Sequence, residues 1–260
     1  MRPSRKSPAA SRGVTMIELL VAVTIGLFIT LVVAQLFLGS RQTFATTDDV
    51  SRMQENIRFT QQLLIRVVHL ASYKSQPNSL TLTVFNPATS PAIAATDGAG
   101  TASDTLTIRY QGSGDGLGAA DGTVVDCLGV ALDSGVTAVN IFSIQQNPTT
   151  LRNGLFCSNG GNAQELVPDI DNMQVLFGED TNGDLTADRY VPLPNVANPS
   201  NIVSVRIALL FQTPTAGSKT VTDAQTYTLD PITPVTLTYP PDRRIRRLVT
   251  TTINVRNRTP

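Results

Sequence analysis

One carboxylate stands in the most apolar part of the chain. Residues 14–38 read VTMIELLVAVTIGLFITLVVAQLFL, and Glu18 is the only ionisable side chain among them. A charged carboxylate in hydrocarbon costs about 2.5 kcal/mol or more, and such residues are usually functional and paired. The sequence therefore predicts a partner for Glu18. The alternative is that the side chain lies near enough to the lipid headgroups to extend into them.

The two cysteines, Cys127 and Cys157, are the second candidate for chemistry. The chain has one histidine and no CxxC pair, so it cannot supply the four ligands of a tetrahedral zinc site. We expect one disulfide between them, which would place this part of the chain in an oxidising compartment. Two unpaired buried thiols are the alternative.

Oxygen-bearing side chains recur in the segment 180–188. Asp180, Asn182, Asp184 and Asp188 occupy its positions 1, 3, 5 and 9. Calcium takes six to eight oxygen ligands, so this spacing predicts a calcium site with a dissociation constant of about 10⁻⁴–10⁻³ M. A backbone carbonyl near Thr186 would add a ligand.

The segment departs from the calcium loop of the EF-hand at two positions. Leu185 stands where that loop has its invariant Gly, and Val191 stands where it has a bidentate Glu. The flanking residues 172–177 and 189–191 are predicted to be strands. The spacing is therefore closer to the calcium loops of FG-GAP repeats, a resemblance limited to twelve residues. The alternative is a hairpin turn without an ion, because Asp, Asn and Gly favour turns.

Catalytic motifs are missing from the sequence. His69, the single histidine, has no Ser or Cys partner in a motif, and we expect it to have a surface or packing role. There is no nucleophile elbow, metal-hydrolase signature or pair of catalytic carboxylates. We therefore predict that the protein is not an enzyme and requires no cofactor.

Charge is unevenly distributed along the chain. Residues 1–13 hold four basic residues and no acid, residues 75–242 hold sixteen acids and five bases, and residues 243–258 hold six arginines. The acidic middle would repel polyanions, which argues against direct binding of nucleic acid.

A single long helix is predicted to position Glu18. The apolar residues 14–39 are long enough to span a bilayer, and the basic residues before them predict a cytoplasmic N-terminus. Residues 40–76 lack proline and carry an apolar stripe at helical spacing, with Pro77 and Asn78 as the predicted end. The stripe consists of Phe44, Met53, Ile57, Leu64, Val67, Val68 and Leu70.

The rest of the chain, residues 77–260, is predicted to form a β-rich head. Alternation of apolar and polar residues predicts strands over 80–85, 105–110, 202–211 and 249–255. The Gly- and Pro-rich segments 86–104 and 111–123 are predicted to be surface loops. The expected fold class is α+β, with the long helix packed on an antiparallel head of one or two sheets.

Residues 12–20, RGVTMIELL, resemble the cleavage motif of type IV prepilins and type II secretion pseudopilins. This resemblance implies that a prepilin peptidase removes residues 1–13 by cutting after Gly13, that Val14 becomes the methylated N-terminus, and that Glu18 guides assembly. The family usually has Phe where this chain has Val14. Pairing of Glu18 with the amino group of Val14 in a neighbouring subunit would offset the burial of both charges.

The segments QLFLGSRQTF (35–44), QENIRF (54–59) and TTINVRNR (251–258) resemble the PilW family of minor pilins. This implies a pilin fold and a low-abundance subunit that primes or caps a type IV pilus. The expected partners are the prepilin peptidase, other minor pilins, the major pilin and the inner-membrane assembly platform. The expected location is the inner membrane and then the fibre tip, with the head in the periplasm.

Two alternatives to a minor pilin stay open. A J-type pseudopilin of a type II secretion system would share the cleavage motif. A single-pass receptor or adhesin that never polymerises would have no use for Gly13 and Glu18. The sequence does not distinguish among twitching, adhesion and DNA uptake.

Overall fold

The computed structural model describes residues 13–75, 90–214, 223–230, 232 and 234–257. The chain divides into two compact units, residues 1–47 and 48–260. The helix α1 (Met16–Leu70) begins in the first unit and ends in the second, and every strand belongs to the second. The predicted fold, a long N-terminal helix followed by antiparallel sheets, is confirmed.

The helix ends earlier than the predicted boundary at residue 76. After Leu70, Ser72 adopts a positive φ of 64°, a left-handed conformation that is common just beyond helix ends. The N–H of Ser72 then donates to the carbonyl of Arg109 at 3.0 Å, so the chain leaves the helix by joining a strand. The predicted stop signal, Pro77 and Asn78, lies outside the described residues.

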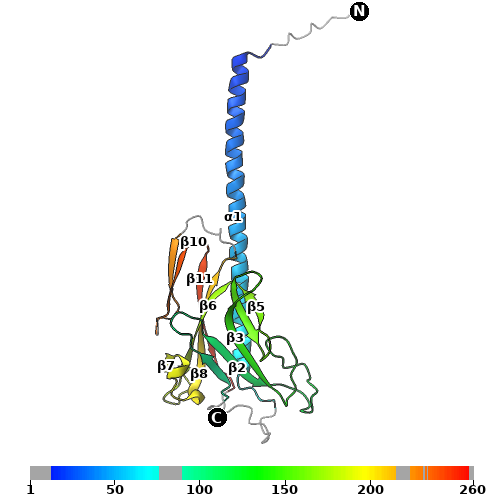
Figure 1. The fold of residues 1–260 in the computed structure, drawn as a ribbon, viewed down its shortest axis with the longest axis vertical. Coiled ribbons are helices and arrows are strands. Elements are labelled where there is room, and N and C mark those ends of the chain that lie inside the picture. Colours follow the sequence, from blue (N-terminus) through cyan, green and yellow to red (C-terminus); the bar gives the residue numbers. More distant parts are fainter. Residues whose placement is uncertain (1–12, 76–89, 215–222, 231, 233, 258–260) are drawn as a thin grey trace, which may run out of the picture. The chain divides into compact units, whose positions relative to one another are not determined.

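In the described part of the second unit, the strands form three antiparallel sheets (Figure 1). The first has the order β1-β2-β3-β4-β5: β1 (Ile93–Thr96), β2 (Thr105–Gln111), β3 (Thr137–Gln146), β4 (Asn153–Ser158) and β5 (Gln164–Pro168). The second has the order β11-β8-β6-β7: β11 (Arg246–Asn254), β8 (Ile202–Gln212), β6 (Ile170–Glu179) and β7 (Arg189–Val191). The third pairs β9 (Asp223–Thr228) with β10 (Thr236–Asp242).

Of the strands predicted over 80–85, 105–110, 202–211 and 249–255, the last three are confirmed, as β2, β8 and β11. The predicted strand over 80–85 falls outside the described residues. The segment 86–104 was predicted to be loop throughout, which is wrong because it contains β1. That strand pairs with β2 from Ile93 opposite Ile108 to Thr96 opposite Thr105. The pairing supplies backbone partners that the short, Ala-rich strand could not indicate from its own sequence.

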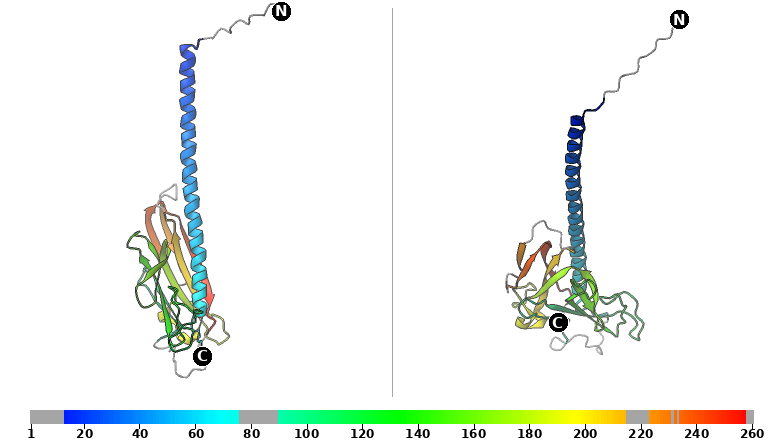
Figure 2. Two further views of the ribbon diagram at one scale, coloured as in Figure 1. Left: turned by 90° about the vertical axis from the view of Figure 1, so that its right-hand side faces the viewer. Right: turned by 45° about the horizontal axis from the view of Figure 1, so that its top comes forward.

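One hydrophobic core joins the helix to both larger sheets. The helix contributes Met53, Leu64, Val67 and Val68, all nearly inaccessible to solvent. The same cluster includes Leu106, Ile108 and Phe142 from the first sheet and Val175, Phe177, Ile207 and Phe211 from the second. In both views of Figure 2 the cyan end of α1 runs beside these strands. The predicted apolar stripe is thus largely confirmed, except that Phe44 is 74% exposed.

The two faces of β8 have different neighbours. Val205, Ile207 and Leu209 face the main core, as the alternation predicted. On the other face, Ala208 and Leu210 pack with residues of the β9–β10 hairpin and the loop that joins its strands, in a smaller cluster. The hairpin therefore covers a sheet face that the sequence pattern assigned to polar residues.

Candidate assembly site and the loops of the head

The N-terminal end of α1 is closed by a reciprocal pair of hydrogen bonds. Thr15 precedes the first helical residue, and its Oγ1 accepts from the N–H of Glu18 at 3.3 Å. In return, Glu18 Oε2 accepts from both the N–H and the hydroxyl of Thr15, each at 3.1 Å. This is a capping box, in which Thr and Glu three residues apart satisfy each other's orphan donors.

This local partner for Glu18 was not predicted, although the pattern Thr-x-x-Glu before an apolar run is visible in the sequence. The carboxylate also lies in the first helical turn, where the helix dipole favours negative charge. Within a single chain, Thr15 therefore supplies a local hydrogen-bond partner for Glu18, and the pairing with Val14 of a neighbouring subunit stays a prediction.

The predicted cleavage site lies just outside the helix. Residues 13–15 are not helical, and no heavy atom of the described residues lies within 4 Å of the position that a Gly13 side chain would occupy. Val14 is 74% exposed. The peptide bond between Gly13 and Val14 is thus free of helical hydrogen bonding and sterically open.

The first unit carries a helix that is long and apolar enough to cross a membrane. Its best window of 18 residues has a mean hydropathy of 2.6 and is fully exposed. The hydroxyls of Thr24 and Thr30 donate to the carbonyls of Val21 and Leu27 at 2.9 and 2.8 Å. Because these hydroxyls are satisfied within the helix, they are compatible with a lipid environment. The helix indicates membrane anchoring.

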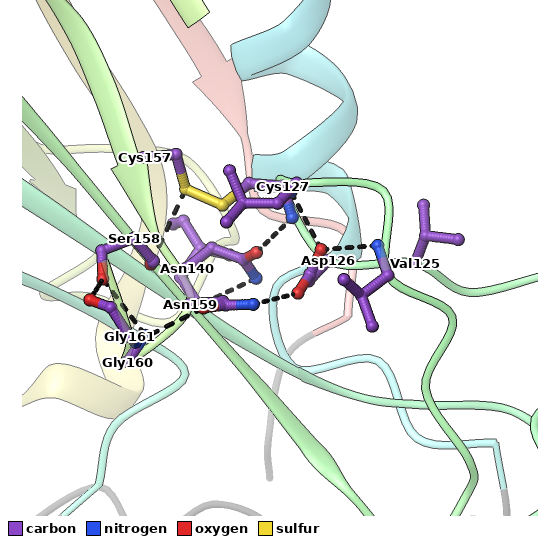
Figure 3. Close-up of a disulfide and its surroundings, with 12 residues drawn as sticks. Val125, Asp126, Cys127, Asn140, Cys157, Ser158, Asn159, Gly160 and Gly161 are labelled. Atoms are coloured by element: carbon purple, nitrogen blue, oxygen red, sulfur yellow. Dashed lines mark hydrogen bonds between the residues drawn. A yellow bond between two sulfur atoms is a disulfide. The ribbon is translucent and has the colours of Figure 1, made fainter. Parts of the chain in front are cut away.

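The predicted disulfide between Cys127 and Cys157 is confirmed (Figure 3). It connects β4 to the segment between β2 and β3, with the two Cα atoms 6.4 Å apart. Asn140 is fully buried beside it, and its Oδ1 accepts from the N–H of Cys127 at 2.7 Å. On the neighbouring turn, Asn159 donates to Asp126 at 2.7 Å. Polar contacts therefore accompany the bond on both of the segments that it joins.

Side chains of the predicted calcium segment organise a tight loop. Asp180 is 3% exposed and accepts from the N–H groups of Gly183 at 2.6 Å and Leu185 at 2.9 Å. Asn182 Nδ2 lies 3.3 Å from Asp184 Oδ2 and 3.0 Å from Asp188 Oδ1. The loop thus brings the four predicted residues together, with Asn182 between two carboxylates.

Backbone donors govern the protonation of this loop. Burial acts to raise the pKa of Asp180, but the N–H groups of Gly183, Leu185 and Asn182 outweigh it, and the pKa lies below its ordinary value. Bonds from Thr186 lower the pKa of Asp184. The loop therefore keeps both carboxylates ionised at neutral pH.

The base of the loop is held by a buried carboxylate that the sequence analysis did not single out. Glu179 is 1% exposed and pairs with Arg189 at 2.7 Å. Its other oxygen accepts from the N–H groups of Ala197 and Asn198 at 3.0 and 3.1 Å. The predicted strands on either side of the loop are confirmed as β6 and β7, which pair from Phe177 opposite Val191 to Glu179 opposite Arg189.

The residue types suit a hard cation, because carboxylate and amide oxygens are the ligands that calcium prefers. Within the described part of the chain, however, no three His, Cys, Asp or Glu side chains are grouped closely enough to hold a metal ion. Calcium binding would require Asn182 to turn its amide oxygen, in place of its nitrogen, toward Asp184 and Asp188. The calcium site stays a prediction.

Part of the second unit resembles a known protein family. Residues 141–257, from within β3 to just beyond β11, match a family model described as type IV pilus-assembly protein W. The resemblance to the PilW family is confirmed. This match does not include the motif at residues 12–20.

Among solved structures, a type IV-like pilin from Thermus thermophilus has 15% sequence identity and a TM-score of 0.45. That similarity covers 80% of this chain and 99% of the other. No curated protein matches the chain. The family match supports a pilin of the type IV pilus system.

Proposed function

We propose that this protein is a minor pilin that primes or caps the assembly of a type IV pilus. Its residues 1–13 are a leader that the prepilin peptidase removes. It then sits in the inner membrane through residues 14–39, with the N-terminus cytoplasmic and the head periplasmic, before it enters the fibre near the tip. Its partners are other minor pilins, the major pilin and the assembly platform.

The observation that carries this proposal is the position of Glu18. It lies at the start of a helix able to span a membrane, five residues beyond Gly13, and among the described residues its carboxylate accepts hydrogen bonds from Thr15. Beyond a cap for the helix, a plain membrane anchor gains nothing from a carboxylate there.

The capping box suggests how Glu18 acts before and during assembly. In the membrane, the bonds from Thr15 lower the energetic penalty of the carboxylate. After cleavage, the amino group of Val14 in a neighbouring subunit provides a charged partner for a carboxylate oxygen. Because that amine exists only in a processed chain, cleavage and assembly are coupled.

Mass spectrometry of the membrane-extracted protein tests the leader. We expect a mature chain that begins at Val14, with 16 basic and 20 acidic residues. Gly13→Ala should slow or block processing. A chain that still begins at Met1, in cells with an active prepilin peptidase, would contradict the proposal.

Substitutions at Glu18 separate its two roles. Glu18→Gln keeps a side chain that can complete a capping box but removes the charge, whereas Glu18→Val removes both. We expect both variants to be cleaved and inserted, and both to impair piliation when they are the only copy. Normal piliation with Gln would show that capping alone is required; normal piliation with Val would refute the role in assembly.

The alternative of a type II secretion pseudopilin shares all of these properties. The family description refers to pilus assembly, which favours the pilus. Loss of piliation with intact secretion, on deletion of the gene, would decide between the two.

A further inference from the structure

The long segment between β2 and β3 does not take part in the proposed assembly site. It runs from Gly112 to Val136 and is joined to β4 by the disulfide of Cys127. We call it the 112–136 loop. Residues 111–151 hold four aspartates, all within this loop, and no Lys or Arg. The sequence analysis treated its first half only as a surface loop.

Two carboxylates hold the tip of this loop. Asp133 accepts from the N–H groups of Gly116 at 2.8 Å and Gly118 at 3.1 Å. Asp115 accepts from the N–H groups of Leu117 at 2.8 Å and Ala119 at 3.1 Å. Four consecutive backbone donors are thereby satisfied, so the conformation of the tip is determined by the fold.

The glycines on either side of Leu117 are part of the same construction. Gly116 has a φ of 77° and Gly118 a φ of 111°, values that favour glycine over residues with a Cβ. These angles, together with the alternating bonds to the two aspartates, place residue 117 at the apex of the tip.

Leu117 projects from this tip into solvent. It is 92% exposed, the highest value for any large apolar side chain among the described residues. A flexible loop could fold such a side chain back onto the protein, but the four satisfied N–H groups oppose that. A single exposed leucine is ordinary on a protein surface, but here a tip with satisfied backbone donors holds the side chain away from the protein, where a partner can reach it.

The charge around Leu117 indicates the kind of surface that it fits. Bonds from Thr123 and Ser113 lower the pKa of Asp121. At Asp133, burial acts to raise the pKa, but bonds from Gly116, Gly135 and Gly118 prevail and lower it. Asp121 and Asp133 thus stay ionised at neutral pH, in a loop that contains no Lys or Arg to offset their charge.

We propose that the tip of the 112–136 loop, with Leu117 as anchor, docks into an apolar recess rimmed by Lys and Arg on a different protein. A membrane is disfavoured because anionic headgroups repel the aspartates. A second copy is disfavoured because residues 48–260 hold 19 acidic and 15 basic residues, so two heads repel each other. The inference does not depend on the proposed role in the pilus.

Site-specific crosslinking of the full chain in its own cells tests this proposal. A photoreactive amino acid replaces the exposed Ala120 beside the tip, and the crosslinked peptide is identified by mass spectrometry. We expect one discrete partner whose crosslinked segment contains Lys or Arg. A product made of two copies of this chain, a partner segment without basic residues, or no product at all would overturn the proposal.

Matched leucine substitutions show whether Leu117 is the anchor. Leu151 is also exposed, at 68%, and lies outside the 112–136 loop. With the photoreactive group at residue 120, Leu117→Ser should reduce the crosslink about tenfold, the loss expected for a binding anchor. Leu151→Ser should leave it unchanged. Neither side chain is in the core, so both variants should melt as the parent does; equal crosslinking in both would overturn the proposal.

Discussion

The 112–136 loop and the loop of residues 180–188 are both built around an aspartate that accepts three backbone N–H groups. In the second loop, the donors to Asp180 belong to Asn182, Gly183 and Leu185, within five residues. In the first, Asp133 accepts from Gly116 and Gly118, 15 to 17 residues earlier, as well as from Gly135. The 180–188 loop is held by contacts within one short segment. The 112–136 loop forms only when its two ends, which are far apart in sequence, meet in the folded protein.

Similar hydrogen bonds to a carboxylate thus give the two loops different surfaces. The local loop draws Asp184 and Asp188 toward Asn182, which makes it a candidate for a cation. The long loop directs its carboxylates inward to backbone donors and leaves an apolar side chain at the tip. The long loop should also depend on the disulfide, and the local loop should not.

Removing the disulfide should therefore have the largest effect. Replacing Cys127 and Cys157 by Ala should destabilise the protein by about 3–4 kcal/mol, because the bond closes a loop of 30 residues in the unfolded chain. Hydrogen exchange of the full chain in detergent should show faster exchange at residues 116–119 and little change at 183–185. Equal acceleration in both loops would remove the proposed difference between them.

Replacing the central aspartate of either loop by Ala should have the next largest effect on stability. Asp133→Ala should lower the midpoint of thermal unfolding by several degrees and expose the N–H groups of Gly116 and Gly118, because each would lose its acceptor. Asp180→Ala should do the same for Gly183 and Leu185. Each variant is the control for the other: if either one loosened both loops, the two could not be independent.

Calcium should affect one loop and spare the other. At ten times the dissociation constant, a bound ion stabilises the folded state by about 1.4 kcal/mol. We expect a rise in melting temperature at millimolar calcium, and protection of residues 181–188 without change in the 112–136 loop.

The control for calcium is the double variant Asp180→Ala with Asp184→Ala, compared with Asp133→Ala. The double variant should lose the response and Asp133→Ala should keep it. If a folded parent protein shows neither heat nor a melting shift in millimolar calcium, the loop is a hairpin turn that needs no ion.

Lowering the pH should have the smallest effect on the stability of the two loops, because a protonated carboxyl keeps an acceptor oxygen. The pKa values of Asp133 and Asp180 are both below the ordinary 3.8 in the folded protein. Each carboxylate therefore contributes stability above pH 3.8, and that contribution is lost as the pH falls through the lowered pKa. Hydrogen exchange between pH 5 and 2.5 should show both loops loosening below about pH 4; loops that tighten on acidification would reverse the assigned sign.

Much of the chemistry was predictable where the interacting residues are close in sequence. The apolar run with Glu18, the strands on either side of the 180–188 loop and the alternation of β8 all follow from patterns within a dozen residues. The capping box of Thr15 and Glu18 was equally local and was overlooked. The exposed position of Phe44 was mispredicted because helical spacing indicates a possible face but does not supply a surface to cover it.

The sequence alone was enough to specify the helix, its apolar half and the motif at Gly13 and Glu18, because helical hydrogen bonds and side-chain spacing are short-range. It also made a disulfide the favoured interpretation, since only two cysteines were available. Three other features depend on the tertiary structure. The chain leaves the helix at Ser72 by joining β2, and Asp104 accepts the N–H of Val175 across 71 residues. Asp133 likewise holds the amides beside Leu117. These contacts depend on sheet pairing and on chain segments meeting in space, which no local periodicity encodes.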